Sequence, residues 1–186
     1  MKKITTAGIV NLFFFVLENQ RTPTSQDFDL HYKLGSAPLT VLFDSNLSEH
    51  SPYLLAGLPG YLLYSQANLP DRTSNIYWTV LPTNTRNQLT FTPGVSDTLP
   101  SASKNILQPG DPRFIVWERH YPSVPGKGSQ IFLTQVGAEK PFETDVSRDI
   151  TIFHYMPIVY GNTVVFVRLD PLNFAGKLFF ATCKTV

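Results

Sequence analysis

The sequence predicts an all-β protein: a single-domain antiparallel β-sandwich, with a jelly roll as the favoured topology. Three observations predict this class. About ten short segments alternate apolar and polar residues, at the spacing expected of sandwich strands. Charged residues make up only 16% of the chain, below the roughly 25% of an average soluble protein, whereas 13% are aromatic. The 15 prolines oppose long helices, and no segment sustains a 3.6-residue period.

The predicted strands follow one another along the chain. Residues 26–34 (QDFDLHYKL) alternate most regularly, with Phe28, Leu30 and Tyr32 on one face. Residues 163–169 (TVVFVRL) are apolar on both faces in their first half, which is typical of a central strand, and Gly161-Asn162 before them predicts a tight hairpin. The other strands are predicted at residues 38–44, 60–66, 75–81, 87–92, 113–121, 129–136, 149–155 and 176–183.

Two long segments are predicted as loops. They are residues 45–59, in which residues 48–56 could form one helical turn, and residues 93–112. Nothing in the sequence indicates a second domain or an internal repeat. A jelly roll has eight strands, so we assign residues 21–186 to the sandwich and residues 1–20 to an apolar N-terminal arm. A fibronectin- or immunoglobulin-like sandwich is the alternative, but its seven strands leave too many segments unused.

Residues 9–17 (IVNLFFFVL) form an apolar stretch behind Lys2-Lys3. No small-residue cleavage site follows, so a signal peptide is not favoured. The stretch is shorter than the about 20 residues of a membrane span, so membrane contact is not favoured either. Consecutive phenylalanines place rings on both faces of a strand. We predict a partner-binding assembly arm, with a further core strand as the alternative; its residues are Ile9, Val10, Leu12, Phe13, Phe14, Phe15, Val16 and Leu17.

The segment Trp117-Glu118-Arg119-His120-Tyr121 contains potential metal ligands. Glu118 and His120 share a strand face because they are two residues apart, and His154 and Arg168 lie on later strands. Two histidines and a carboxylate form the facial triad of non-haem iron oxygenases, but there a histidine precedes the carboxylate. We therefore expect no metal and no cofactor, and we interpret this segment as a solvent-facing strand end with Glu118 and Arg119 in water.

Other features limit the function classes. The net charge is +1 and no basic cluster follows Lys2-Lys3, so direct binding of nucleic acid is not expected. The single cysteine, Cys183, excludes an intrachain disulfide. Aromatic residues with polar tips could instead form a sugar-stacking platform. These residues are Tyr61, Tyr64, Tyr77, Trp78, Trp117 and Tyr121.

The sequence as a whole indicates a non-enzymatic structural or assembly protein. Low charge, many aromatic residues and the apolar arm favour a virion subunit at a capsid vertex, in a spike or on the capsid surface, assembled in the host cytoplasm. We expect a homo-oligomer that binds itself or other structural proteins. One alternative is a carbohydrate- or receptor-binding sandwich, which would be secreted. A second alternative is a jelly-roll metal-dependent oxygenase.

Overall fold

A computed structural model describes the backbone of residues 4–9, 12–20, 28–43, 47–55, 60–68, 73–81, 85–103, 114–135, 144–147, 151–170 and 172–183. Every regular element in these ranges is a β-strand, so the prediction of an all-β protein is confirmed. Within the same ranges, no helix is long and apolar enough to cross a membrane. The chain divides into two compact units, Met1–Pro93 and Gly94–Val186, a division that the sequence did not indicate.

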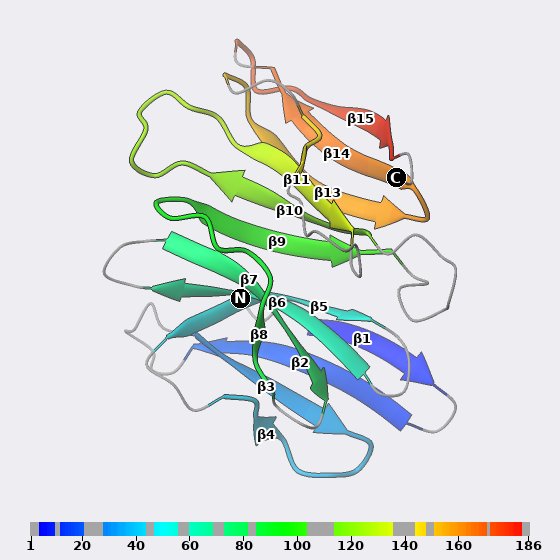
Figure 1. Cartoon of the computed structure of the whole chain (residues 1–186). Helices are drawn as coiled ribbons and strands as arrows, with labels where there is room; N and C mark the ends of the chain where they lie inside the picture. Colours follow the sequence, from blue (N-terminus) through cyan, green and yellow to red (C-terminus); the bar gives the residue numbers. More distant parts are fainter. Residues whose placement is uncertain are drawn as a thin grey trace. The chain divides into compact units, whose positions relative to one another are not determined.

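The first unit contains two antiparallel strand groups, each paired in chain order (Figure 1). The first group comprises β1 (Ile4–Ile9), β2 (Leu12–Gln20), β3 (Phe28–Leu34) and β4 (Thr40–Val41). The second group comprises β5 (Ser48–Leu55), β6 (Gly60–Asn68), β7 (Thr73–Leu81) and β8 (Asn87–Gln88). Buried apolar side chains join the two groups in one core, which contains Leu30, Leu42, Phe43, Leu54, Leu62, Tyr64 and Leu81.

The second unit repeats this arrangement (Figure 1). Its first group comprises β9 (Ser96–Ala102), β10 (Phe114–His120), β11 (Gln130–Gln135) and β12 (Thr144–Asp145). Its second group comprises β13 (His154–Tyr160), β14 (Thr163–Leu169) and β15 (Gly176–Thr182). The core between them consists of Phe114, Val116, Ile131 and Leu133 from the first group, and Val159, Val164 and Phe166 from the second.

The jelly-roll topology is not confirmed. A jelly roll contains Greek keys, in which a strand returns to pair beside one far away in sequence. Within each unit, every strand instead pairs with the strand that precedes or follows it in the chain. Short hairpins produce this order; the predicted turn at Gly161-Asn162 joins β13 to β14, with Gly161 at a φ of 56°.

The strands that open three of the groups share one irregularity. In β5, β9 and β13, a residue in the left-handed region precedes a proline: Ser51-Pro52, Leu99-Pro100 and Met156-Pro157. The φ angles of the first residues are 53°, 49° and 53°. At each of these pairs the register with the next strand shifts, as at a β-bulge. The three groups are therefore structural repeats, although the sequence did not indicate a repeat.

This irregularity explains three errors in the sequence-based strand boundaries. Residues 48–55 form β5 and not a helical turn, and β9 lies inside the predicted loop at residues 93–112. The strand predicted at residues 149–155 instead occupies residues 154–160. The physical reason is the same each time, because the bulge breaks the alternation of apolar residues and proline lowers the apparent strand propensity.

A buried polar residue lies at the same distance before each bulge. Three residues before each proline lies a fully buried titratable side chain: Glu49, Asp97 or His154. Each is opposite a long polar residue on the next strand, in the pairs Glu49–Gln66, Asp97–Arg119 and His154–Arg168. A third strand continues each row with Asn75, Gln130 or Lys177. Each repeat therefore carries one polar row across its first three strands.

Candidate protein-interaction face

The β13–β15 sheet has two apolar faces with different surroundings. One face carries Val159, Val164 and Phe166 and is buried in the core of its unit. The opposite face is open to solvent, and we call it the outer face. Its large apolar side chains are mostly exposed: Ile158 59%, Tyr160 68%, Leu178 65% and Phe180 69%. Met156, in the bulge beside this face, is 67% exposed.

The strand register makes the outer face continuous. Ile158, Val165 and Phe180 lie side by side across β13, β14 and β15. The next row along the strands consists of Tyr155, Val167 and Leu178. Because side chains alternate between faces, the charged residues Arg168 and Lys177 belong to the opposite face. The outer face is thus an apolar surface three strands wide.

The edge of this sheet is also open among the described residues of its unit. In this part of the chain the strand order is β13-β14-β15, so β15 pairs with β14 on one side only. Natural proteins commonly protect such edges with charges, prolines or bulges. In β15, Leu178 and Phe180 are exposed and pairing with β14 is regular over residues 176–182. An exposed apolar face beside an open edge is typical of a surface that binds another protein chain.

The sequence analysis missed the outer face, although one signal for it was present. The prediction ended a strand at residue 155, just before the alternating residues Met156, Ile158 and Tyr160. The strand at residues 176–183 was predicted, but both of its faces are apolar (KLFFATC), so its solvent side could not be assigned. Residues 163–169 were correctly predicted as a central strand, since β14 lies between β13 and β15.

The predicted assembly arm corresponds to β1 and β2. Their backbones form a hairpin in which Ile4 pairs with Leu17, and β2 also pairs with β3 over residues 14–20. Val10 lies outside the described residues, and the side chains of the other predicted arm residues are also outside the description. The arm's backbone is therefore part of a sheet in the first unit. Its role in partner binding stays a prediction.

The potential metal ligands do not gather into one site. Nε2 of His120 lies 2.7 Å from Oε1 of Glu118, whereas Nδ1 of His154 lies 3.0 Å from the carbonyl oxygen of Ser129. In the part of the chain that the structure describes, no three His, Cys, Asp or Glu side chains form a cluster suited to a metal.

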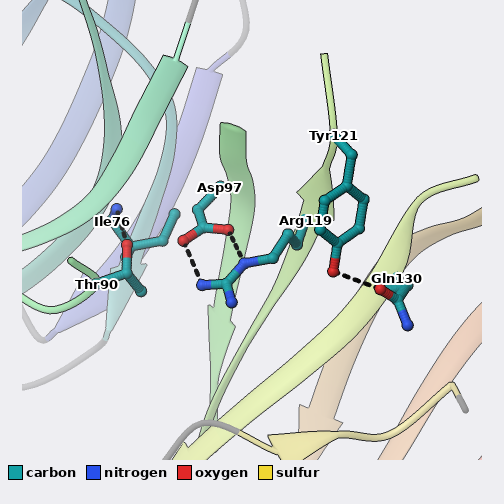
Figure 2. Close-up of polar contacts among 6 residues, drawn as sticks. All are labelled: Ile76, Thr90, Asp97, Arg119, Tyr121 and Gln130. Atoms are coloured by element: carbon teal, nitrogen blue, oxygen red, sulfur yellow. Dashed lines mark hydrogen bonds and ion pairs between the residues drawn. The ribbon is translucent and has the colours of Figure 1, made fainter. Parts of the chain in front are cut away.

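The interpretation of residues 117–121 as a solvent-facing strand end is wrong for two residues. Glu118 and Arg119 are both buried. Arg119 is held by Asp97 on β9, through Nε–Oδ1 and Nη2–Oδ2 contacts of 2.7 and 2.8 Å, as Figure 2 shows. Its guanidinium also lies 4.2 Å from the centre of the Phe132 ring. These partners compensate the buried charge, which the sequence alone could not indicate.

Polar contacts continue along β11. The hydroxyl of Tyr121 donates to Gln130 (Figure 2), and the amide of Gln130 donates to Asp145 on β12. Asp145 in turn accepts from the backbone N–H and the hydroxyl of Ser147. Because these groups bond one another, they join the residue that follows β10 to β11 and β12 as a structural network.

Two of the six residues of the predicted sugar-stacking platform are not at the surface. Tyr64 and Trp117 are fully buried and belong to the interior. Tyr61 stacks on Trp78 with ring centres 6.0 Å apart, and both remain half-buried. Tyr121 lies in the other unit, where the ammonium group of Lys127 is 3.3 Å from the centre of its ring.

Tyr64 supplies a test of the buried polar groups in the first unit. Its hydroxyl is buried and has no hydrogen-bond partner among the described residues. Removing an unsatisfied buried hydroxyl recovers its desolvation penalty, so Tyr64→Phe should raise the free energy of unfolding by about 1 kcal/mol. Urea denaturation at pH 7 checks this increase. The half-buried Tyr61→Phe is the control, and a loss of stability in Tyr64→Phe would contradict the expectation.

The same variant has a pH signature. Burial raises the pKa of Tyr64 far above its usual value of 10.0, and the nearby Arg86 only partly opposes this shift. Above about pH 10 the unfolded chain therefore binds fewer protons at this tyrosine than the folded chain, so stability falls as pH rises. Tyr64→Phe should therefore remove the part of the fall in stability above about pH 10 that this tyrosine causes.

No known protein family and no curated protein matches the sequence. Solved structures do match the fold. A putative TolB from Agrobacterium tumefaciens superposes with a TM-score of 0.62 at 13% identity, covering 91% of this chain and 57% of the other. TolB from Acinetobacter baumannii superposes with a TM-score of 0.61 at 17% identity, covering 90% of this chain and 38% of the other. The chain therefore spans about half or less of these proteins, and the likeness concerns a propeller-like β fold and not a sandwich.

Proposed function

We propose that this protein is a non-enzymatic structural protein that acts through protein–protein contacts, and that the outer face of β13–β15 makes one of them. The observation that carries the proposal is the set of four large apolar side chains, each at least 59% exposed, on a single sheet face: Ile158, Tyr160, Leu178 and Phe180. Side chains of this size present roughly 400 Å² of apolar surface, within the range of the largest patches on typical monomers.

Energetics support a partner on this face. Full burial of an apolar side chain of this kind contributes about 1.5–3 kcal/mol. The four residues already make part of their contacts, so covering them would contribute about half of that value each, or about 3–6 kcal/mol in total. This sum offsets part of the entropy lost on binding, and the other contacts of a complementary partner surface must supply the rest.

The setting of this function stays a prediction from the sequence. We propose a virion structural subunit, because the low charge and the aromatic content are typical of proteins that assemble into lattices. A carbohydrate- or receptor-binding module remains the alternative, and the half-buried Tyr61–Trp78 pair is the observation that favours it.

A photo-crosslinking amino acid at position 180 tests the proposal in the organism that makes the protein. We expect position 180 to crosslink to protein and to identify the complex, including virion proteins if the predicted setting is right. Position 91 is the matched control, because Phe91 is also 69% exposed but lies outside the β-strands of its unit. Crosslinking at neither position, or equally at both, would contradict a specific contact at the outer face.

A further inference from the structure

Three rows of paired residues make up the outer face. In order along the strands, the rows are Tyr155–Val167–Leu178, Ile158–Val165–Phe180 and Tyr160–Thr163–Thr182. No residue of these rows is charged, and Val165 occupies their centre. Large apolar side chains lie on both sides of Val165, with Ile158 on β13 and Phe180 on β15. This arrangement allows the face to meet a copy of itself across a two-fold axis near Val165.

The inner face of the same sheet shows which kind of surface covers such a face in this protein. In the core of the second unit, the inner face of β13–β15 and the β9–β12 sheet contribute valine, isoleucine, leucine and phenylalanine side chains to one cluster. Two apolar sheet faces of similar composition therefore pack against each other. The outer face carries the same side-chain types, namely Ile158, Val165, Val167, Leu178 and Phe180.

We propose that the outer face of β13–β15 binds the outer face of a second copy of this chain. This inference rests on the proposed function and names its partner. The contact is isologous, because both copies use the same residues, and it is complete when two copies have joined. The two sheets pack face to face about 10 Å apart, as the sheets of a β-sandwich do.

Charge and area are compatible with a second copy. The rows contain no charged side chain, so no like charges oppose each other across the two-fold axis. The four most exposed side chains present roughly 400 Å² on each copy, and the contact covers both sets at once. With the half-buried Tyr155, Val165 and Val167, the total approaches the roughly 1,000 Å² that specific contacts exceed. A contact of this size predicts a dissociation constant of about 1–100 µM.

Light scattering on the purified full chain is the first test, with a reductant present because Cys183 is a free cysteine. At high concentration we expect a particle of twice the 20.9 kDa chain mass. Phe180→Asp should raise the dissociation constant at least tenfold, because each copy then carries a charge into the apolar contact. Ile158→Asp, on the other side of Val165, should have the same effect.

Phe91→Asp is the matched control. Phe91 is as exposed as Phe180, at 69%, but lies outside the outer face, so this variant should dimerise like the wild type. Circular dichroism spectra must show that each variant is folded. A folded wild type that stays monomeric at about 500 µM, above the expected dissociation constant, would overturn the proposal.

A mixed-copy experiment tests whether the contact is isologous. Tagged Phe180→Asp is mixed with untagged wild type, and the recovered wild type is compared with that recovered by tagged wild type. We expect at least tenfold less recovery, because one altered face impairs the shared contact. Comparable recovery would mean that the outer face binds a different surface of the second copy, which would overturn the proposal. Crosslinking to a different protein in the native source, with a monomeric purified chain, would also overturn it but leave the proposed function intact.

Discussion

Replacing Asp97 with asparagine is expected to lower the free energy of unfolding by about 3–5 kcal/mol, because the variant removes the carboxylate that holds the buried Arg119 guanidinium. In the native protein, two contacts of 2.7 and 2.8 Å hold Arg119 on Asp97, and both side chains are buried. Total stabilities of single domains are about 5–15 kcal/mol, so this one change would remove a large fraction of the total. Urea denaturation of wild type and variant measures the difference.

A double variant separates the ion pair from the packing around it. Asp97→Leu combined with Arg119→Met removes both charges, and the methionine side chain replaces the guanidinium that lies 4.2 Å from the centre of the Phe132 ring. Buried ion pairs are often replaceable by apolar residues of similar volume with little loss. We therefore expect the double variant to be more stable than Asp97→Asn. If the double variant is as unstable as Asp97→Asn, the polar row itself, and not the unpaired charge, is required.

The second large effect is expected for Gly128→Ala. A Cβ atom at position 128 would lie 2.2 Å from the carbonyl oxygen and 2.5 Å from the carbonyl carbon of Ile152. Both are backbone atoms, so the segment that leads into β13 would have to move. The movement would disturb the contacts between Ser129 and His154, in which the Ser129 hydroxyl donates to the His154 carbonyl at 2.6 Å and accepts from the His154 N–H at 3.0 Å.

We expect Gly128→Ala to lower the free energy of unfolding by about 3 kcal/mol or more, combining overpacking with the loss of one or two hydrogen bonds. Gly126→Ala is the control. Its Cβ would meet no atom within 4 Å, but its φ of 75° is unfavourable for alanine, with an expected effect of about 1–2 kcal/mol. If Gly126→Ala is as damaging as Gly128→Ala in thermal denaturation, the steric explanation fails.

The local pattern of the sequence determined the strand class. Alternation and aromatic content predicted an all-β protein, and regular strands such as residues 28–34 and 163–169 were placed correctly. These strands have no interruption, so each side chain reports its face directly through the two-residue period. Strands β5, β9 and β13 were missed or displaced because each contains a proline at a bulge. The sequence contains the repeated pattern, because each of the three prolines follows a titratable residue by three positions. Only the structure shows that the three positions are equivalent.

Tertiary structure alone decided which side chains are buried and which face is free. From the sequence, Glu118 and Arg119 were interpreted as a solvated pair, because charged residues usually lie in water. Both are buried in the structure. The partner of Arg119, Asp97, is 22 residues away in the sequence. The outer face could not be found from sequence, because β14 and β15 are apolar on both sides and the pattern does not say which side is covered. Burial of one face depends on which strand group packs on it, and that is a property of contacts between segments distant in sequence. The sequence by itself therefore determined the all-β class and the uninterrupted strands, whereas the strand pairing and the packing of the strand groups, which decided the candidate site, required the tertiary structure.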